Sequence, residues 1–350
     1  MAPEMAQVET PSIAVIGDGQ MGLFCAALLG QGQRARSVTL WGHEGPAVEE
    51  LAQSRVSGRL AGLRVPERVR VTPDLRVALS GAEVVISAVP TQFIRSVWSR
   101  AEVRAGLSAG AAVVSVSKGL EDGRLLRPTQ VLAEALSDDP DRAGRSYAVL
   151  SGPTIAAELA RCLPATMIAA SDDAGLAARV QGLFTTQWLR IYTGEDPLGV
   201  ELAGATKNVI AIAAGILDGL QAGFNAKSAL LARGLAEIAR LGTAMGAKAE
   251  TFFGLAGAGD LATTCFSPEG RNRSLGEALG RGERLEAYLA RTRSVVEGVA
   301  TTRAVVELSG KYRVEMPIAS AVHAVLYEGL DPLEAIARLM SRLPKAERVG

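Results

Sequence analysis

The sequence predicts an α/β sheet of the doubly wound type, followed by a domain built only of helices. Three observations support this fold class. Short, uniformly apolar segments alternate with helical patterns up to about residue 195, a glycine-rich turn follows the first of them, and strand patterns cease after Val200. Apolar segments of this kind are covered by helices on both faces, as in a parallel sheet. At 350 residues the chain is also long for a single core.

The elements follow one another in the order expected for this fold. Strands are predicted at 12–17, 37–42, 68–72, 82–89, 111–118 and 146–152, with edge strands at 164–171 and 189–194. Helices between them are predicted at 20–32, 46–55, 92–105 and 126–136. Later helices are predicted at 200–220, 227–245, 249–253, 273–280, 284–291, 297–309, 317–327 and 331–340. We therefore expect a flexible extension over 1–11, an α/β domain over 12–195 and a helical domain over 196–345.

Composition excludes several classes of function. Lysine plus arginine and aspartate plus glutamate each number 37, so no general attraction to nucleic acid is expected. Two histidines and three widely spaced cysteines disfavour a metal site and indicate a reducing, cytoplasmic location. The N-terminus lacks the apolar region of a signal peptide, and no uncharged apolar run reaches the ~18 residues of a membrane span.

The turn "GDGQMG" matches G-x-G-x-x-G between a predicted strand and a predicted helix, the context in which this motif binds a dinucleotide. Gly17 permits the tight turn, Gly19 lets the backbone approach the pyrophosphate, and Gly22 allows close packing of helix on strand. The phosphates then meet the helix N-terminus. The first domain is thus predicted to be of the Rossmann type and to bind NAD or NADP.

The choice between NAD and NADP is left open by the end of the second strand. Trp41 and Gly42 stand where an acid would bind the adenosine ribose, and Glu44 comes slightly late. His43 is placed either to face a 2′-phosphate or as a solvated loop residue. A second glycine match, Gly257 to Ala262, lacks a βαβ context, and we expect it to be a loop that places Asp260.

The apolar helix "VELAGATKNVIAIAAGIL" contains one cation, Lys207. Burial would lower its pKa toward the range useful for proton transfer, unless the side chain extends to water. Small residues on the same face, such as Gly204, permit close approach of other groups. Asn208 beside it is placed to orient a substrate hydroxyl. Lys118 follows a strand whose carboxyl end faces the expected ligand crevice.

Two polar turns complete the candidates. "SGPT" offers N–H and hydroxyl donors at Gly152 and Thr154, or simply begins a helix. "GRNRSLG" places Arg271 and Arg273 at a helix start, where they serve either as phosphate donors or as a surface pair.

These motifs together resemble NAD(P)-dependent glycerol-3-phosphate dehydrogenase of the bacterial type. The resemblance rests on "GDGQMG", "LWGHE", "SKGLE", "SGPTIAAEL", "GATKNVIAIAAGILDGL", "GLAGAGDLATTC", "GRNRSLG", "VVEGVATTRAV" and "VEMPI" in this order. It implies reversible reduction of dihydroxyacetone phosphate to sn-glycerol 3-phosphate, a precursor of glycerophospholipids, without a metal. A homodimer is expected from the prevalence of two-fold assemblies.

The resemblance also implies roles for single residues. It implies catalysis by Lys207, as proton donor and acceptor, with Asp260 and Lys118. Substrate binding is implied for Lys118, Gly152, Thr154, Lys207, Asn208, Asp260, Gly270, Arg271 and Asn272. Cofactor binding is implied for Gly17, Gly19, Gln20, Met21, Gly22, His43, Lys118, Ala156, Arg271, Val295 and Glu297.

The chain departs from the family's pattern at a few positions. The family usually has a small residue in place of Asp18, and a serine and an aromatic residue in place of Gln20 and Met21. Asp18 puts an anion beside the phosphate-binding turn, which would weaken cofactor affinity or shift cofactor choice. Gly270 replaces a common serine and its hydroxyl donor.

The alternative functions for this sequence are another β-hydroxyacid or ketopantoate-type reductase, and a non-catalytic NAD(P)-binding protein.

Overall fold

The computed structural model of the chain describes residues 10–138, 144–292, 294–344 and 346, so the expected extension over 1–11 lies mostly outside the described residues. The strands are β1 (Ser12–Ile16), β2 (Ser37–Trp41), β3 (Val69–Thr72), β4 (Val84–Ser87), β5 (Ala112–Ser115), β6 (Tyr147–Ser151), β7 (Ala165–Ala170) and β8 (Leu189–Gly194). The helices among them are α1 (Gln20–Leu29), α2 (Gly45–Ser54), α3 (Leu75–Leu79), α4 (Thr91–Trp98), α5 (Ala101–Gly106), α6 (Pro128–Leu136), α7 (Ala156–Ala160) and α8 (Ala174–Phe184).

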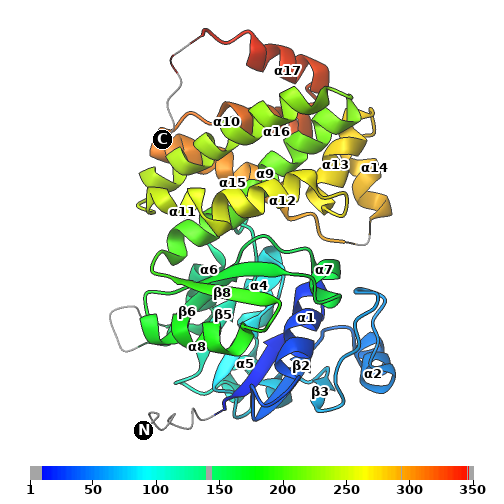
Figure 1. The fold of residues 1–350 in the computed structure, drawn as a ribbon, viewed down its shortest axis with the longest axis vertical. Coiled ribbons are helices and arrows are strands. Elements are labelled where there is room, and N and C mark those ends of the chain that lie inside the picture. The colour runs from blue at the N-terminus through cyan, green and yellow to red at the C-terminus, as the bar shows by residue number, and fades with distance from the viewer. Residues whose placement is uncertain (1–9, 139–143, 293, 345, 347–350) are drawn as a thin grey trace.

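After β8 the described chain is helical. The helices are α9 (Pro197–Gly219), α10 (Gly223–Ala244), α11 (Ala249–Phe253), α12 (Asp260–Phe266), α13 (Arg271–Gly280), α14 (Leu285–Arg291), α15 (Glu297–Tyr312), α16 (Pro317–Tyr327) and α17 (Pro332–Met340). A π-helical turn, η1 (Leu255–Gly259), joins α11 to α12. Figure 1 shows the sheet and its helices in one half of the molecule and α9 to α17 in the other.

The described strands form one sheet in the order β3-β2-β1-β4-β5-β6-β7-β8. Neighbouring strands are parallel except β6 and β7, which are antiparallel, so the sheet is mixed rather than wholly parallel. One apolar layer covers each face, and strands β4 and β5 are buried along their whole length. Because the strand order runs outward in both directions from β1 and β4, their carboxyl ends mark the switch point where such sheets bind ligands.

Helix α9 is the core of the second half. Nearly every residue from Gly199 to Leu217 is buried, and α10, α12, α13 and α15 pack around it. The helix is long and apolar enough to cross a membrane, but its most apolar window lies entirely inside the fold. Core helices of soluble proteins meet the same criterion, so this is weak evidence for a membrane span.

Several predicted elements need correction. The helix expected over 92–105 is two helices, because α4 ends at Trp98 and Arg100 is extended. Helices α3 and α8, each with an aspartate cap that accepts a backbone N–H, were not predicted. The glycine segment 257–262 is not a loop: it belongs to η1 and the start of α12. A Cβ on Gly257 would lie 1.9 Å from the carbonyl oxygen of Phe252, so the close approach expected there does occur.

Candidate active site

Two lysines from different halves of the molecule share one buried carboxylate. Nζ of Lys207 lies 2.5 Å from Oδ1 of Asp260, and Nζ of Lys118 lies 2.6 Å from Oδ2 of the same residue. The side chain of Asp260 is fully buried, whereas that of Lys118 keeps 19% of its surface exposed. The bridge therefore joins the carboxyl edge of the sheet to the centre of the helical half.

The position of Lys118 in the site depends on the residues that surround it. Lys118 follows β5 at the edge where ligands bind, and it also donates to the carbonyl of Gly152 at 2.9 Å and to Oγ1 of Thr154 at 3.3 Å. Gly152 directly follows β6 and has φ +133°, a conformation that favours glycine. Gly204 on α9 packs beside Lys118 and Ser151, since a Cβ there would lie 3.3 Å from Oγ of Ser151 and 3.5 Å from Cγ of that lysine.

The environment of Lys207 changes its protonation. Burial lowers the pKa of Lys207 to about 8, and the nearby charge of Lys118 acts in the same direction, while Asp260 opposes both. Nζ of Lys207 also donates to Oγ1 of Thr264 at 2.5 Å. This amine can therefore exist charged or neutral near physiological pH, as a group that both gives and takes a proton requires.

Thr264 was missed by the sequence reasoning. It stands four residues after Asp260 on α12, so both side chains lie on one face of the helix, and that spacing is the signal that would have found it. Asn208 contacts the site from the other side, donating from Nδ2 to the carbonyl of Lys118 at 3.1 Å. Its amide thus fixes the backbone that carries Lys118.

The glycine turn has the geometry of a dinucleotide site. Gly17 has φ +116°, and a Cβ on Gly22 would lie 1.8 Å from the carbonyl oxygen of Gly17. Space beside Gly19 is open, since among the described residues no atom beyond its chain neighbours lies within 4 Å of a Cβ built there. Helix α1 begins after Gly19 with no side-chain cap and no acid in its first turn. Its first N–H groups are free for a pyrophosphate, so the residues present fit the cofactor.

The end of β2 carries an ion-pair group that sequence reasoning did not foresee. Nη1 of Arg59 lies 2.6 Å from Oδ2 of Asp18, and its Nη2 lies 2.8 Å from Oε2 of Glu44. Asp18 is thus neutralised by a paired cation rather than left as an isolated anion. His43 has an exposed side chain near Glu44, which leaves both of its sequence-based interpretations standing.

The helical half contributes the segment from Gly270 to Asn272 at the start of α13. Nη1 of Arg271 donates to the carbonyl of Val295 at 2.8 Å, and Oδ1 of Asn272 accepts from the backbone of Gly298 at 2.9 Å. These contacts hold the α13 start against the start of α15. Arg273 instead pairs with Asp218 at 2.6 Å and belongs to the packing of the helical half.

Glu297 begins α15 and faces the sheet. Its Oε1 accepts from the backbone N–H of Thr91 at 3.1 Å, and burial raises its pKa to about 7. Its Oε2 has no hydrogen-bond partner among the described residues, and neither do the buried hydroxyls of Ser87, Thr91 and Ser151. Buried polar atoms without partners are costly, so their presence near the carboxyl ends of β4 and β6 fits a ligand at this edge.

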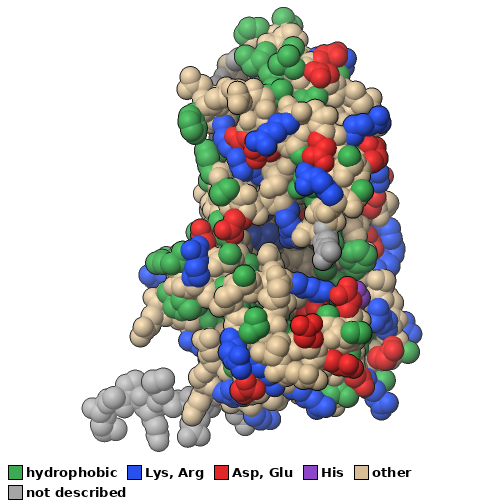
Figure 2. All heavy atoms as spheres, turned by 90° about the vertical axis from the view of Figure 1, so that its right-hand side faces the viewer, with side chains coloured by type: hydrophobic (Ala, Val, Ile, Leu, Met, Phe, Trp, Pro, Cys, Tyr) green, Lys and Arg blue, Asp and Glu red, His purple; other side chains and the backbone are tan. Residues whose placement is uncertain are grey.

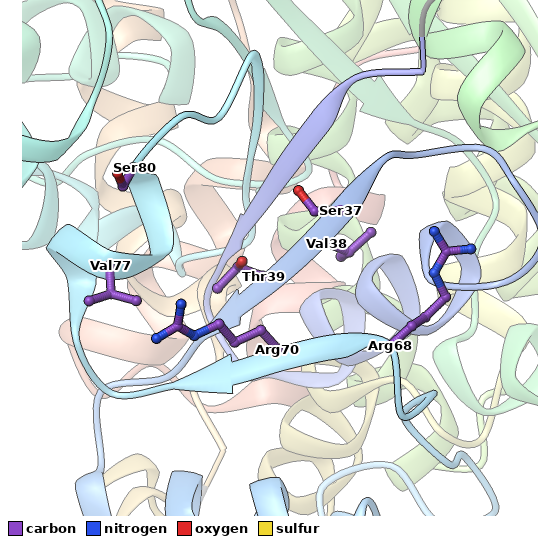
Figure 3. A pocket seen from close by; sticks show the side chains of 7 residues that line it. All are labelled: Ser37, Val38, Thr39, Arg68, Arg70, Val77 and Ser80. Atoms are coloured by element: carbon purple, nitrogen blue, oxygen red, sulfur yellow. The ribbon is translucent and has the colours of Figure 1, made fainter.

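The surface agrees with this placement. Figure 2 shows a hollow at mid-height of the molecule in which lysine and arginine atoms lie. A different hollow, of about 410 Å³, lies over the starts of β2 and β3. Ser37, Thr39 and Arg70 line it (Figure 3), at the end of the strands opposite to the glycine turn. Within the described residues, no three metal-ligating side chains are grouped to hold an ion.

Comparisons with known proteins agree with this architecture. The family model for the N-terminus of NAD-dependent glycerol-3-phosphate dehydrogenase matches residues 12–177, and the model for its C-terminus matches residues 196–337. The chain belongs to the NAD-dependent glycerol-3-phosphate dehydrogenase family. It is thus an NAD(P)-dependent oxidoreductase with a Rossmann-type sheet and a helical C-terminal part.

Relatives of this family match over almost the whole chain. A glycerol-3-phosphate dehydrogenase (NAD(P)+) of Geobacillus kaustophilus is 44% identical over 338 residues, 96% of each chain. One of Geobacter sulfurreducens is 43% identical over 96% of this chain and 98% of its own. The crystal structure of the Coxiella burnetii enzyme is 36% identical with a TM-score of 0.88, covering 95% of this chain and 99% of that one.

The alternative reductase is not favoured by these matches. A ketopantoate reductase structure from Ralstonia eutropha is 16% identical with a TM-score of 0.56, covering 93% of this chain and 99% of that one. This likeness shows a shared fold alone. The full-length relatives above are all glycerol-3-phosphate dehydrogenases.

Proposed function

We propose that this chain reduces dihydroxyacetone phosphate to sn-glycerol 3-phosphate with NADH or NADPH, and that Lys207 moves the proton. The observation that carries the proposal is the Lys207–Asp260–Lys118 bridge beside the carboxyl ends of the sheet. A carbonyl reduction needs a proton donor at the oxygen and a positive environment for the charge that develops there. The bridge supplies both from one group of side chains.

Lys207 has the donor capacity for this role. An ammonium group has three N–H donors, and the described contacts of Nζ take up two of them, at Asp260 and Thr264. The third is available for the substrate oxygen. After the proton has passed to the alkoxide, the neutral amine stays hydrogen-bonded, and the lowered pKa makes that state accessible. In the reverse direction the neutral amine takes the proton from the substrate hydroxyl.

The cofactor would be held by the glycine turn. Gly17, Gly19, Gln20, Met21 and Gly22 would hold the pyrophosphate at the start of α1, where N–H groups are free. Val295, Glu297 and Ala156 line the same crevice in this proposal, and His43 faces the adenosine end. When bound, the reduced nicotinamide supplies the hydride. Figure 1 places the end of α1 that begins at Gln20 near the helical half.

The substrate phosphate is assigned to the α13 start. Arg271 offers a planar guanidinium, Asn272 keeps its amide N–H groups, and Gly270, whose backbone N–H donates to the carbonyl of Ser267 at 3.4 Å, stands beside them at the N-cap. Gly152 and Thr154, which contact Lys118, would bind the remaining hydroxyl together with Asn208. Orientation by several donors at fixed positions is the main contribution expected of these residues.

A substrate panel tests the proposed reaction. Oxidation of NADH and of NADPH should be measured with dihydroxyacetone phosphate, dihydroxyacetone and ketopantoate under the same conditions. We expect turnover with the phosphorylated ketone and a much higher KM for dihydroxyacetone, which lacks the phosphate. Faster turnover of ketopantoate would contradict the proposal, and binding of the dinucleotides with no turnover of any ketone would indicate a non-catalytic protein.

Assembly, location and domain division are parts of the same proposal. We propose a homodimer through the helical half, supported by an apolar hollow of about 360 Å³ lined by Leu231, Leu235 and Phe266, whose side chain is half-exposed. Sedimentation equilibrium tests the homodimer, and a monomer mass at micromolar concentration would contradict it.

We propose domains at 12–195 and 196–345. We also propose a cytoplasmic location, which is supported by the free thiols of Cys25, Cys162 and Cys265.

A further inference from the structure

An acid lies in the adenosine part of the nucleotide site, but it comes from an unusual position in the chain. Asp18 stands between the first two glycines of the turn, and its side chain is 10% exposed. A Cβ built on Gly42 would lie 2.8 Å from Cγ of Asp18 and 3.0 Å from its Oδ2. The carboxylate of Asp18 therefore fills, together with Cγ2 of Val48 at 2.5 Å, the space that a side chain at Gly42 would occupy directly after β2.

That space is where a dinucleotide fold needs a carboxylate. In such folds an acid at the end of the second strand accepts a hydrogen bond from the ribose 2′-hydroxyl of NAD. Here β2 ends at Trp41 and continues with Gly42 and His43, so no acid comes from the strand itself. Asp18 brings a carboxylate to the same place from the glycine turn.

The neighbouring cation is already engaged. Arg59 donates to Asp18 and to Glu44 with different nitrogens, at 2.6 and 2.8 Å. An arginine beside this position accommodates the 2′-phosphate of NADP in other dinucleotide folds. To do so here, Arg59 would have to leave two carboxylates, and the 2′-phosphate would come to lie against Asp18. Like charges placed together in this way oppose binding.

We propose that Asp18 accepts a hydrogen bond from the ribose 2′-hydroxyl, and that Asp18 and Glu44 together keep Arg59 from pairing with a 2′-phosphate. The chain then binds NAD(H) in preference to NADP(H). This inference rests on the nucleotide placement of the proposed function.

The test measures binding, not turnover. The dissociation constants of NADH and NADPH are determined separately for the ligand-free enzyme by isothermal titration calorimetry. For the wild type we expect a Kd for NADPH at least about tenfold above that for NADH. Asp18→Asn keeps the volume beside Gly42 but removes the charge, so this ratio should fall by about tenfold, chiefly through tighter NADPH binding.

Two variants sharpen the comparison. Glu44→Gln removes the other carboxylate on Arg59 and should change the ratio less than Asp18→Asn, because Glu44 is more exposed and was not placed at the ribose. Glu67→Gln removes an exposed carboxylate that pairs with Arg55 and Arg64, and it should leave the ratio unchanged. Because the ratio compares the dissociation constants of two ligands for the same protein, a general loss of folded enzyme does not change it. If Asp18→Asn does not fold, Asp18→Ser takes its place.

Four results would overturn the inference. Equal wild-type affinities for the two dinucleotides, or an Asp18→Asn ratio equal to that of the wild type, would show that Asp18 does not select the cofactor. A larger effect of Glu44→Gln would transfer the role to Glu44. Absence of binding of both dinucleotides would overturn the nucleotide site itself, and so the proposed function as well.

Discussion

At the scale of single residues, the site depends on one carboxylate shared by two ammonium groups. Asp260 is fully buried, and it accepts from Lys207 and Lys118 with different oxygens. A buried charge is tolerated only when it is paired, and here three charged groups from three elements pair with one another. A change to Asp260 or Lys118 therefore alters the pKa of Lys207.

This coupling predicts the dependence of the reaction on pH. Reduction needs the charged Lys207, so its rate should fall as the pH rises through about 8, whereas oxidation needs the neutral amine and should rise through the same range. Asp260 favours the charged form, so in Asp260→Asn the falling limb of the reduction profile should move to lower pH. Steady-state rates from pH 6 to 10 in both directions check this. An unchanged limb in the variant would show that Asp260 does not set the charge of Lys207.

Arg271 offers a second prediction at this scale. Replacing it with alanine should raise the KM for dihydroxyacetone phosphate by at least about tenfold with a smaller change in kcat, as expected for lost phosphate binding. The matched control is Arg281→Ala at the end of the same helix, where the side chain is exposed and pairs with Glu277. Equal KM values in the two variants would show that Arg271 only ties α13 to Val295.

The residues could be predicted from sequence to different degrees. Lys207 stood out because it is the one cation in an apolar helix, and Lys118 because it follows a strand at the ligand edge. Their bridge through Asp260 joins positions 142 and 53 residues apart and could not be read from spacing. The pairing of Asp18 with Arg59 spans 41 residues and was likewise hidden.

At the scale of elements, the contact between α9 and α13 depends on glycine. A Cβ on Gly276 would lie 2.0 Å from the carbonyl oxygen of Ile212, and one on Gly215 would lie 2.0 Å from that of Arg273. The two backbones are therefore in direct contact, and this contact fixes α9, which carries Lys207, against α13, which carries Arg271.

Gly276→Ala should therefore destabilise the protein, by ~1–3 kcal/mol or more, because the added methyl group overpacks this contact. Gly182→Ala is the matched control, since Gly182 lies within helix α8 and, apart from the adjacent backbone of that helix, no atom of the described residues lies within 4 Å of a Cβ built there. The control should be neutral or stabilising by up to ~1 kcal/mol. Urea unfolding of both variants measures the difference, and equal midpoints would contradict the close packing of α9 on α13.

Elements were predicted well where the hydrophobic pattern was long or bounded by clear signals. Helices α11 and α16 begin and end at the predicted residues, and the strands agree to within a few positions. The turn η1 was missed because its glycines suggest a loop, whereas Gly257 packs directly against the backbone of Phe252 within a helical turn. The antiparallel pairing of β6 and β7 was missed because an apolar strand carries no sign of its direction.

At the scale of the whole molecule, the two halves are joined by further contacts besides the lysine bridge. Glu201 on α9 is buried and accepts from Arg127 and from the backbone and hydroxyl of Thr129, at the start of α6. Arg303 on α15 pairs with Asp122 on the sheet side, but both side chains are exposed. The contacts of Glu201 hold α9 against the sheet side of the molecule, and the pair formed by Arg303 does the same for α15.

Burial decides which of these contacts stabilises the molecule. Glu201→Ala leaves the mostly buried Arg127 without its partner and should lower the free energy of unfolding by ~3–5 kcal/mol. Asp122→Asn removes the exposed pair and should cost less than ~1 kcal/mol. Calorimetric unfolding of both variants compares the two, and a larger effect of Asp122→Asn would contradict this ranking.

The central claim is that Lys207 transfers the proton while the dinucleotide transfers the hydride. The most direct test is the rate of NADH oxidation by Lys207→Met with saturating dihydroxyacetone phosphate at pH 7, with the Kd for NADH measured alongside. We predict a loss of about 10²–10⁴ in rate with an unchanged Kd, because the variant keeps the apolar stem and loses the proton donor. Turnover equal to that of the wild type would contradict the account.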